Sequence, residues 1–439
     1  MADIVDRRQE ATAWGGGPGG RTDLALALAI LGFWALWTLW SYWNELPPDL
    51  SAIYVAGWFW QNGEPGLIYD APPHFFGGTP PLWIGLVERI GGPEATAFPY
   101  IYPPLWAALV APVTGWMDAL EFSRAVYILH LALIIASVFV AAHLARPRQM
   151  PYWSWALLAV AALMLSTSAK SALDQNQPTI TTTFLLLFCL DRLLSGKDRA
   201  AGLCLALAAA LKVTPALFVV ILILERRFRA VAAFAVAGGL LAGLSLLLCG
   251  IEAHWQFRDA VGRISDNGLI SAVNLSLRTA LYGIEALFDA VPAFDIEGRN
   301  VTIGGLPGWV GLALAMGASM IAAGWLLRLR RLHEVARMPL SWLTIALIVP
   351  LFGPLGWQHY YLLPLFLLPC LITRLPAGLR WLAITAVLVS SALLTLLLTA
   401  LMPWPTMGYV WIATAGWLVV LGLIPFARDD QNGRTTLPE

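Results

Sequence analysis

Asp49 is the residue with the clearest capacity for chemistry. It follows the first long apolar segment, directly after Pro47 and Pro48, and aromatic residues come soon after it. A carboxylate accepts protons and hydrogen bonds, and an acid where a membrane helix emerges into water is costly enough to be a functional candidate. This placement predicts chemistry at a bilayer surface. An acid that only caps or hydrogen-bonds at a helix entrance is the competing interpretation.

Other polar side chains interrupt the apolar segments or stand at their ends. Charged and amide groups in such positions are expensive in a membrane and are candidate site residues by default. We expect them to share one cavity with Asp49, because all fall at one side of the predicted helices. In chain order they are Tyr102, Arg124, Lys170, Gln175, Asn176, Gln177, Lys212, Asn274, Arg278, Trp357, Gln358 and His359.

The elements that must position these residues are membrane helices. Of the 439 residues 59% are hydrophobic and 12% charged, and the mean hydropathy of +0.70 excludes an ordinary soluble domain. A spanning helix needs roughly 20 apolar residues. We predict an all-α polytopic membrane protein of about 10 to 13 transmembrane helices. The predicted segments are 24–43, 123–144, 152–167, 179–194, 229–248, 308–327, 340–351, 360–372, 381–402 and 410–426.

Two further apolar stretches, 103–116 and 200–223, contain Pro112 and Pro215, which end or kink a helix. Irregular backbone at membrane depth is tolerated only where it is buried in protein or lines a cavity. We therefore predict broken or re-entrant segments here that form walls of the site.

The charge pattern predicts the orientation and the domain organisation. Most of the 27 Lys and Arg residues flank the side on which the N-terminus lies, so both termini are predicted to be cytoplasmic. The N-terminus (1–23) is predicted to be disordered, 24–428 to form one transmembrane domain, and 429–439 to be a cytoplasmic tail. Two long outer loops, about 44–121 and 250–306, are of a length that is usually functional. No basic stripe suited to nucleic acid occurs.

Seven short motifs, in this order, resemble glycosyltransferase family 87, whose members are GT-C fold enzymes similar to polyprenol-phosphate-mannose-dependent mannosyltransferases. The resemblance covers roughly residues 24 to 375. In this family's pattern a pair of histidines follows the late tryptophan, whereas Gln358 takes the first of those places here. The motifs are Asp49, Gly66-Leu67-Ile68-Tyr69, Tyr100-Ile101-Tyr102-Pro103-Pro104, Gln175-Asn176-Gln177, Lys212-Val213-Thr214-Pro215, Asn274-Leu275-Ser276 and Trp357-Gln358-His359.

The resemblance implies an inverting transfer of a hexose, with mannose expected, from a polyprenyl-phosphate donor at the outer face of the cytoplasmic membrane. Asp49 then matches the general base that takes the proton of the acceptor hydroxyl. The departing phosphate needs preplaced donors. The candidates are Lys212, Arg124, His359, Arg278 and Lys170. An interfacial anchor is the alternative for Arg124, and a snorkelling or ion-paired lysine is the alternative for Lys212. His359 could instead orient the acceptor or be a satisfied buried histidine.

Amide and aromatic residues are the candidates for binding the sugar and the acceptor. Amides both donate and accept hydrogen bonds, as sugar hydroxyls require. Aromatic rings can stack on a sugar or line a lipid groove, although packing alone explains each of them as well. The amide candidates are Gln175, Asn176, Gln177, Asn274 and Gln358, and the aromatic ones are Tyr54, Tyr69, Tyr102 and Trp357.

No cofactor is predicted, and no metal site: Glu45 and Asp49 are four residues apart, but prolines break the helix that would align them. The predicted partners are the polyprenyl-phosphate-linked sugar, a lipid or glycan acceptor that the sequence does not identify, and membrane lipids. A transporter or flippase of lipid-linked sugar is the rival function. Internal repeats and ionisable residues near the middle of several helices would favour that rival.

Overall fold

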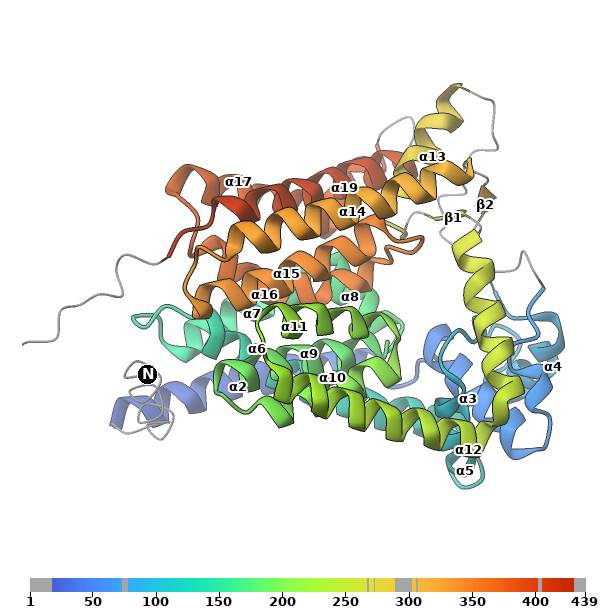
Figure 1. Cartoon of the computed structure of the whole chain (residues 1–439). Coiled ribbons are helices and arrows are strands. Elements are labelled where there is room, and N and C mark those ends of the chain that lie inside the picture. The colour runs from blue at the N-terminus through green and yellow to red at the C-terminus, as the bar shows by residue number, and fades with distance from the viewer. Residues whose placement is uncertain are drawn as a thin grey trace, which may run out of the picture.

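The structure, a computed structural model, describes residues 18–72, 78–266, 268–271, 273–288, 302–304, 307–401 and 405–429. In this part of the chain long helices run side by side in one bundle (Figure 1). Six described helices are long and apolar enough to cross a membrane: Gly20–Ser41, Ala119–Ala145, Phe228–Arg263, Gly308–Leu329, Glu334–Phe352 and Met407–Phe426. The prediction of an all-α polytopic membrane protein is confirmed.

The bundle consists of long helices and of shorter ones that pack between them. Many outward-facing side chains are large and apolar, such as Trp40 (72% exposed) and Leu247 (86% exposed), as expected for a lipid-facing surface. The longer helices are α2 (Pro18–Ser41), α6 (Ala119–Ala145), α7 (Tyr152–Leu165), α9 (Thr179–Leu194), α10 (Asp198–Leu211), α12 (Phe228–Asp266), α14 (Gly308–Leu329), α15 (Glu334–Phe352), α17 (Ala377–Ser391) and α19 (Pro405–Leu423), the last followed by η5 (Ile424–Phe426).

The first predicted outer loop, 44–121, is largely helical. Its described residues form α3 (Pro48–Gln61), η1 (Pro65–Leu67), η2 (Pro81–Trp83), α4 (Ile84–Gly91) and α5 (Pro104–Thr114), which gather at one end of the bundle (Figure 1). They have an apolar core of their own, which includes Phe59, Trp83 and Tyr100. Helix α3 was not predicted: Pro47 and Pro48 start a new helix instead of a loop, because proline suits the first helical position.

Helix α12 changes direction at Gly250, whose φ of 68° lies in the left-handed region that glycine adopts at no steric cost. Beyond this residue the helix runs across the end of the bundle toward two short strands (Figure 1). The predicted loop 250–306 therefore begins as a helix. It continues through β1 (Gly268–Ile270), α13 (Leu277–Phe288) and β2 (Thr302–Gly304), and β1 pairs antiparallel with β2, with Leu269 opposite Ile303.

Four predicted segments are interrupted. The predicted break near Pro215 is present: α10 ends at Leu211, and η3 (Thr214–Phe218) and α11 (Val219–Leu224) follow. Segment 152–167 ends early and is followed by the short α8 (Thr167–Asp174). Segment 360–372 begins as η4 (Gln358–Tyr361) before α16 (Leu362–Ile372). Segment 381–402 is two helices, α17 and α18 (Leu393–Thr399), because Ala392 takes an extended conformation and bridges to Ser166.

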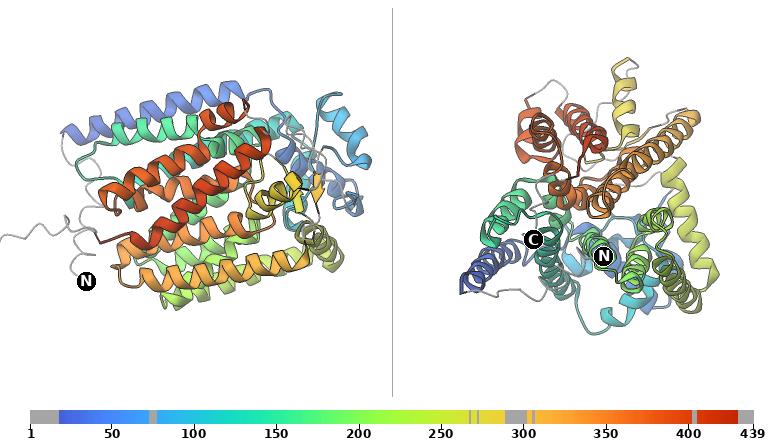
Figure 2. Two further views of the ribbon diagram at one scale, coloured as in Figure 1. Left: turned by 90° about the horizontal axis from the view of Figure 1, so that it is seen from above. Right: turned by 60° about the vertical axis from the view of Figure 1, so that its left-hand side comes forward.

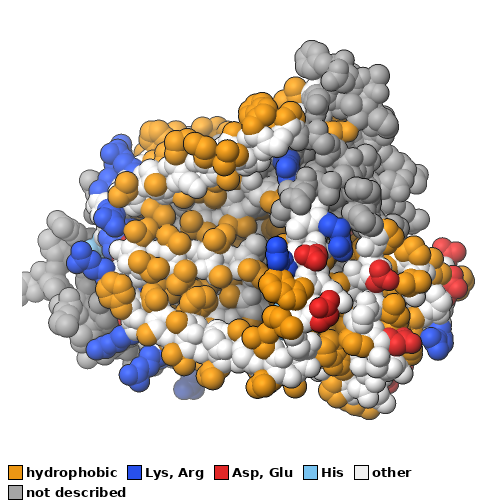
Figure 3. Space-filling view, turned by 45° about the vertical axis from the view of Figure 1, so that its right-hand side comes forward, with side chains coloured by type: hydrophobic (Ala, Val, Ile, Leu, Met, Phe, Trp, Pro, Cys, Tyr) orange, Lys and Arg blue, Asp and Glu red, His pale blue; other side chains and the backbone are white. Residues whose placement is uncertain are grey.

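The two ends of the bundle differ in charge. Lys and Arg gather at one end, and Asp and Glu gather over the α3 to α5 end (Figure 3). The start of α2 and the end of α19 lie at the basic end (Figures 1 and 2). Residues 1–23 were predicted to be disordered, but the first described residues, 18–23, are helical. The Asp23 carboxylate accepts hydrogen bonds from the backbone N–H groups of Tyr152 and Trp153. The rest of that predicted segment (1–17) and most of the predicted tail (430–439) lie outside the described residues.

Candidate active site

The side chains of Asp49 and Lys212 are both hydrogen-bonded to the side-chain amide of Gln177. Asp49 lies in the first turn of α3, and one oxygen of its carboxylate accepts a hydrogen bond from Nε2 of Gln177. Oε1 of the same Gln177 accepts a hydrogen bond from Lys212 Nζ at 3.2 Å. The three residues come from segments far apart in the sequence. The sequence prediction that Asp49 and Lys212 share one site agrees with this geometry.

Lys212 stands where α10 has ended and η3 has not begun. Its backbone is extended (φ −142°, ψ 134°), and Pro215 prevents α10 from continuing. The ammonium donates to Thr179 Oγ1 at 2.6 Å and lies 4.7 Å from the ring centroid of Tyr360. An ammonium has three donors, of which Gln177 and Thr179 take two. The third N–H can therefore serve an anionic ligand.

Thr179 and Tyr360 were assigned no role from the sequence. Thr179 begins α9 two residues after Gln177, and Tyr360 directly follows His359. Their closeness to motif residues is the signal that could have identified them.

His359 is a second donor beside the lysine. It lies on η4, is 6% exposed, and packs edge-on against Tyr360 with 4.8 Å between ring centroids. Its Nε2 is buried and has no hydrogen-bond partner among the described residues. A buried nitrogen without a partner costs about 1–3 kcal/mol. A bound ligand that accepts a hydrogen bond from Nε2 would remove this cost.

Buried tyrosines form one wall of the site. The Tyr102 hydroxyl donates to Gln177 Oε1 at 3.3 Å, and its ring centroid lies 5.8 Å from Lys212 Nζ. Tyr69 supports Tyr102 by donating to its backbone carbonyl at 2.7 Å. Tyr54 instead donates to the carbonyl of Met117 at 2.9 Å, a contact within the outer helical layer. Of the three predicted tyrosines, only Tyr102 contacts the polar cluster directly.

The protonation of Asp49 responds to these surroundings. Burial raises the pKa of the Asp49 carboxyl above its ordinary value, and the hydrogen bond from Gln177 and the charge of Lys212 act against that rise. A carboxylate with a raised pKa is a stronger base than a solvated one. The competing interpretation is an acid that only caps or hydrogen-bonds at a helix entrance. Its capping form receives no support, because the side chain makes no capping bond to α3, whereas the hydrogen bond from Gln177 fits its other form as well as it fits a base.

Two of the predicted phosphate donors are engaged outside this cluster. Arg124 donates through Nε to the Trp43 carbonyl at 2.9 Å and through Nη2 to Asn44 at 3.0 Å, and its guanidinium stacks 4.6 Å from the centroid of the Trp43 ring. These contacts fit the alternative role as an interfacial anchor. Lys170 is exposed and forms an i, i+4 ion pair of 2.8 Å with Asp174.

The predicted amides divide into two that contact Asp49, Gln175 and Gln177, and three that bind other parts of the fold. Gln175 is near the base, since its Oε1 lies 3.4 Å from the backbone nitrogen of Asp49. Asn176 is fully buried and binds helix α6. The Asn274 side chain accepts hydrogen bonds from the N–H groups of Ser276 and Gly356, and the Asn274 backbone forms a β-bridge with Trp357. These contacts hold the two loops together. Gln358 donates to the Tyr409 hydroxyl at 3.3 Å. Asn176, Asn274 and Gln358 thus shape the site in this structure.

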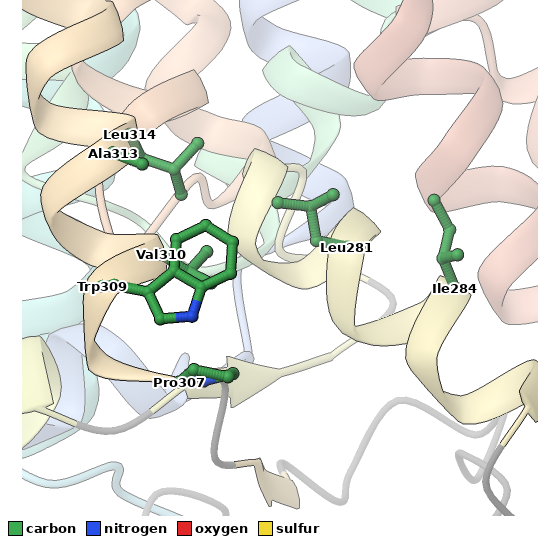
Figure 4. A pocket seen from close by; sticks show the side chains of 7 residues that line it. All are labelled: Leu281, Ile284, Pro307, Trp309, Val310, Ala313 and Leu314. Atoms are coloured by element: carbon green, nitrogen blue, oxygen red, sulfur yellow. The ribbon is translucent and has the colours of Figure 1, made fainter.

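An apolar groove of about 450 Å³ opens between α13 and α14 (Figure 4). Leu281 and Ile284 line it from α13, and Trp309 and Leu314 from the α14 side. Arg278 lies close by: its Nη2 is 3.5 Å from where a Cβ on Gly311 would stand. Arg278 follows the Asn274 loop, which is joined through Trp357 to the segment that carries His359.

Among the described residues no group of three or more His, Cys, Asp or Glu side chains is placed to hold a metal ion. The fold and this cluster define a polytopic helical membrane protein in which a half-buried carboxylate and a half-buried lysine are joined through one glutamine at a polar site. The model of Glycosyltransferase family 87 matches residues 100–354, more than half of the chain, so the protein belongs to this family of membrane glycosyltransferases. No curated protein matches the chain.

Proposed function

We propose that the protein transfers a hexose, with mannose as the expected sugar, from a polyprenyl-phosphate donor to an acceptor hydroxyl. Transfer occurs with inversion at the outer face of the cytoplasmic membrane. One observation carries the proposal: the carboxylate of Asp49 and the ammonium of Lys212 bind opposite ends of the Gln177 amide. A base and a cation at this spacing suit a reaction that removes a proton and releases an anion.

In this mechanism Asp49 accepts the proton of the acceptor hydroxyl as its oxygen attacks the anomeric carbon. The bond between that carbon and the phosphate oxygen breaks with its electron pair on the phosphate. Lys212 and His359 meet the developing charge, through the remaining ammonium N–H and through the unpartnered Nε2 when protonated there. Preplaced donors of this kind stabilise the transition state without reorganisation.

The apolar groove and the distribution of charge support the lipid donor and the orientation. A prenyl chain needs an apolar channel, and the groove between α13 and α14 adjoins Arg278 and the segment that carries His359. The basic end of the bundle would face the cytoplasm, where loops carry an excess of Lys and Arg. Asp49 would then face outward, on α3 at the opposite end.

Reconstituted protein with a synthetic polyprenyl-phosphate-mannose donor tests the proposal. Asp49→Asn and Asp49→Ala are expected to lose transfer by about 10²–10⁴-fold, the usual contribution of acid–base catalysis. Asp70→Asn is the matched control, because Asp70 is an exposed acid of the same outer segment. Near-normal transfer by both Asp49 variants would remove Asp49 as the base.

The rival function, movement of a lipid-linked sugar across the bilayer, makes a different prediction in the same vesicles. Donor would change leaflet without forming a new glycosidic bond, and substitution of Asp49 would leave that movement intact.

The identity of the sugar is tested with a second donor that carries another hexose on the same lipid. The preferred donor is the one with the higher kcat/KM.

A further inference from the structure

The position of Gln177 depends on the end of α8 and the turn that follows it. Tyr127 of α6 and Tyr42, which directly follows α2, bind the end of α8. The Tyr127 hydroxyl on α6 donates to the Leu173 carbonyl at 2.9 Å. The Tyr42 hydroxyl donates to the carboxylate of Asp174, and the Tyr42 ring stacks on Tyr127 with 5.4 Å between centroids. The turn is thus fixed from one side before the chain reaches Gln177.

His130 on α6 contacts Asn176, the residue directly before Gln177. It is 3% exposed, with Nδ1 2.7 Å from Asn176 Oδ1 and Nε2 3.1 Å from Thr181 Oγ1. The Nδ2 of Asn176 donates to the Ser123 carbonyl at 3.1 Å, so its Oδ1 is the end that accepts. Nδ1 of His130 therefore carries the proton, and Nε2 accepts from the Thr181 hydroxyl. Each ring nitrogen has one defined role.

Asn176 has a backbone that needs such support. Its φ of 42° lies in the left-handed region, which costs an L-residue about 1–2 kcal/mol and which asparagine tolerates better than most. This conformation reverses the chain after α8 and directs the next side chain, Gln177, toward Asp49 and Lys212. A substitution of His130 would therefore displace Asn176 and, with it, the Gln177 amide that binds Asp49.

We propose that His130 is a positioning residue for the transfer reaction: through Asn176 it holds Gln177 where its amide binds Asp49 and Lys212. This inference rests on the proposed function. It assigns a role to a histidine that touches neither Asp49 nor Lys212 in the described contacts and that belongs to none of the sequence motifs. A displaced Gln177 leaves the base and the cation poorly aligned with the reacting atoms.

Two substitutions of similar polarity separate this role from simple packing. An asparagine amide can take the place of Nδ1, so His130→Asn keeps the donor to Asn176. A glutamine amide takes the place of Nε2, so His130→Gln loses that donor. We expect His130→Gln to lower kcat by about 10- to 100-fold, since misplacement of about 1 Å can cost that much, with the donor KM changed less than about threefold. His130→Asn should restore most of kcat.

The pH dependence of kcat separates the proposed role from a packing role, because a packing defect alone would not shift it. Because the Gln177 hydrogen bond lowers the pKa of Asp49, its loss in His130→Gln should shift the acid limb of kcat to higher pH, and His130→Asn should not shift it. His143→Gln is the control, being the same change at the far end of α6, and should keep kcat within about threefold of the unmodified protein.

Equal kcat and equal acid limbs for His130→Asn and His130→Gln would overturn the inference. If His130→Gln does not fold, Asn176→Gly takes its place. Glycine keeps the backbone conformation but loses the bonds to His130 and to the Ser123 carbonyl, and wild-type kcat in that variant would also overturn the inference. Asp49→Asn is assayed in parallel. Normal transfer by Asp49→Asn refutes the proposed base, whereas an inactive Asp49→Asn with indistinguishable His130 variants refutes only the role of His130.

Discussion

Lys212 and Asp49 bind opposite ends of one side-chain amide, that of Gln177. The orientation of this amide is determined by charge, because the reverse orientation would place an N–H₂ group against the ammonium and an oxygen against the carboxylate. Gln177 therefore stands between the two charges and keeps them from collapsing into a direct ion pair. In the proposed reaction the carboxylate remains available to the acceptor hydroxyl, and the ammonium keeps a donor for the phosphate.

Lys212→Met is expected to lower kcat by about 10²–10³-fold, the usual cost of losing one donor to a developing anion. Lys212→Arg should recover only part of the loss, because its planar fork does not reproduce the bonds to Gln177 and Thr179. Steady-state kinetics with the synthetic donor measure both. Lys197→Met, an exposed lysine at the basic end, should leave kcat unchanged, and an equal loss there would contradict a specific role for Lys212.

The acid limb of the pH–rate profile should report Asp49. Its raised pKa means that the carboxylate is protonated, and activity lost, at a higher pH than for a solvated aspartate; activity is regained as the pH rises through that pKa. Gln177→Leu removes a hydrogen bond that lowers this pKa, so the limb should move to still higher pH. Rates from pH 4 to 8 at saturating donor test this, and a limb that moves to lower pH would be inconsistent with it.

Arg124→Gln should have little effect on transfer. The guanidinium is engaged with Trp43 and Asn44, and exposed interactions of this kind contribute little, so we expect kcat/KM within about threefold of the unmodified protein. The measurement is the donor concentration dependence of transfer in detergent. A large rise in the donor KM would return Arg124 to the phosphate site that the sequence predicted.

Gly202→Ala should destabilise the bundle where α10 packs on α12. A Cβ at Gly202 would lie 2.2 Å from the Ala230 carbonyl oxygen and 2.8 Å from the Phe234 nitrogen, and backbone atoms cannot move aside easily. We expect a loss of about 1–3 kcal/mol in the free energy of unfolding. Gly238→Ala on α12 is the control: a Cβ there meets nothing within 4 Å, so better helix propensity should make it neutral or stabilising. Thermal unfolding followed by circular dichroism compares the two, and similar midpoints would show that the packing can relax.

The sequence by itself determined the class of fold and the family, and it selected the candidate base. Long apolar runs specify membrane helices because backbone polar groups must be satisfied inside lipid, and that requirement is local. The break before Pro215 could be read in the same way, since proline acts on its own turn. Asp49 and Lys212 could be selected because charge near lipid is costly wherever the chain goes next.

Only the tertiary structure decided which polar residues meet. Arg124 and Lys212 are both candidate phosphate donors in the sequence. In the structure Arg124 packs on Trp43 and Lys212 binds Gln177, because contacts between distant segments depend on how the helices pack. The same packing makes Asn176 a structural residue and brings Thr179 and Tyr360 to the lysine. His130 belongs to no motif, and its role follows from the 2.7 Å contact with Asn176, since a hydrogen bond requires a distance and a direction that spacing along the chain does not specify.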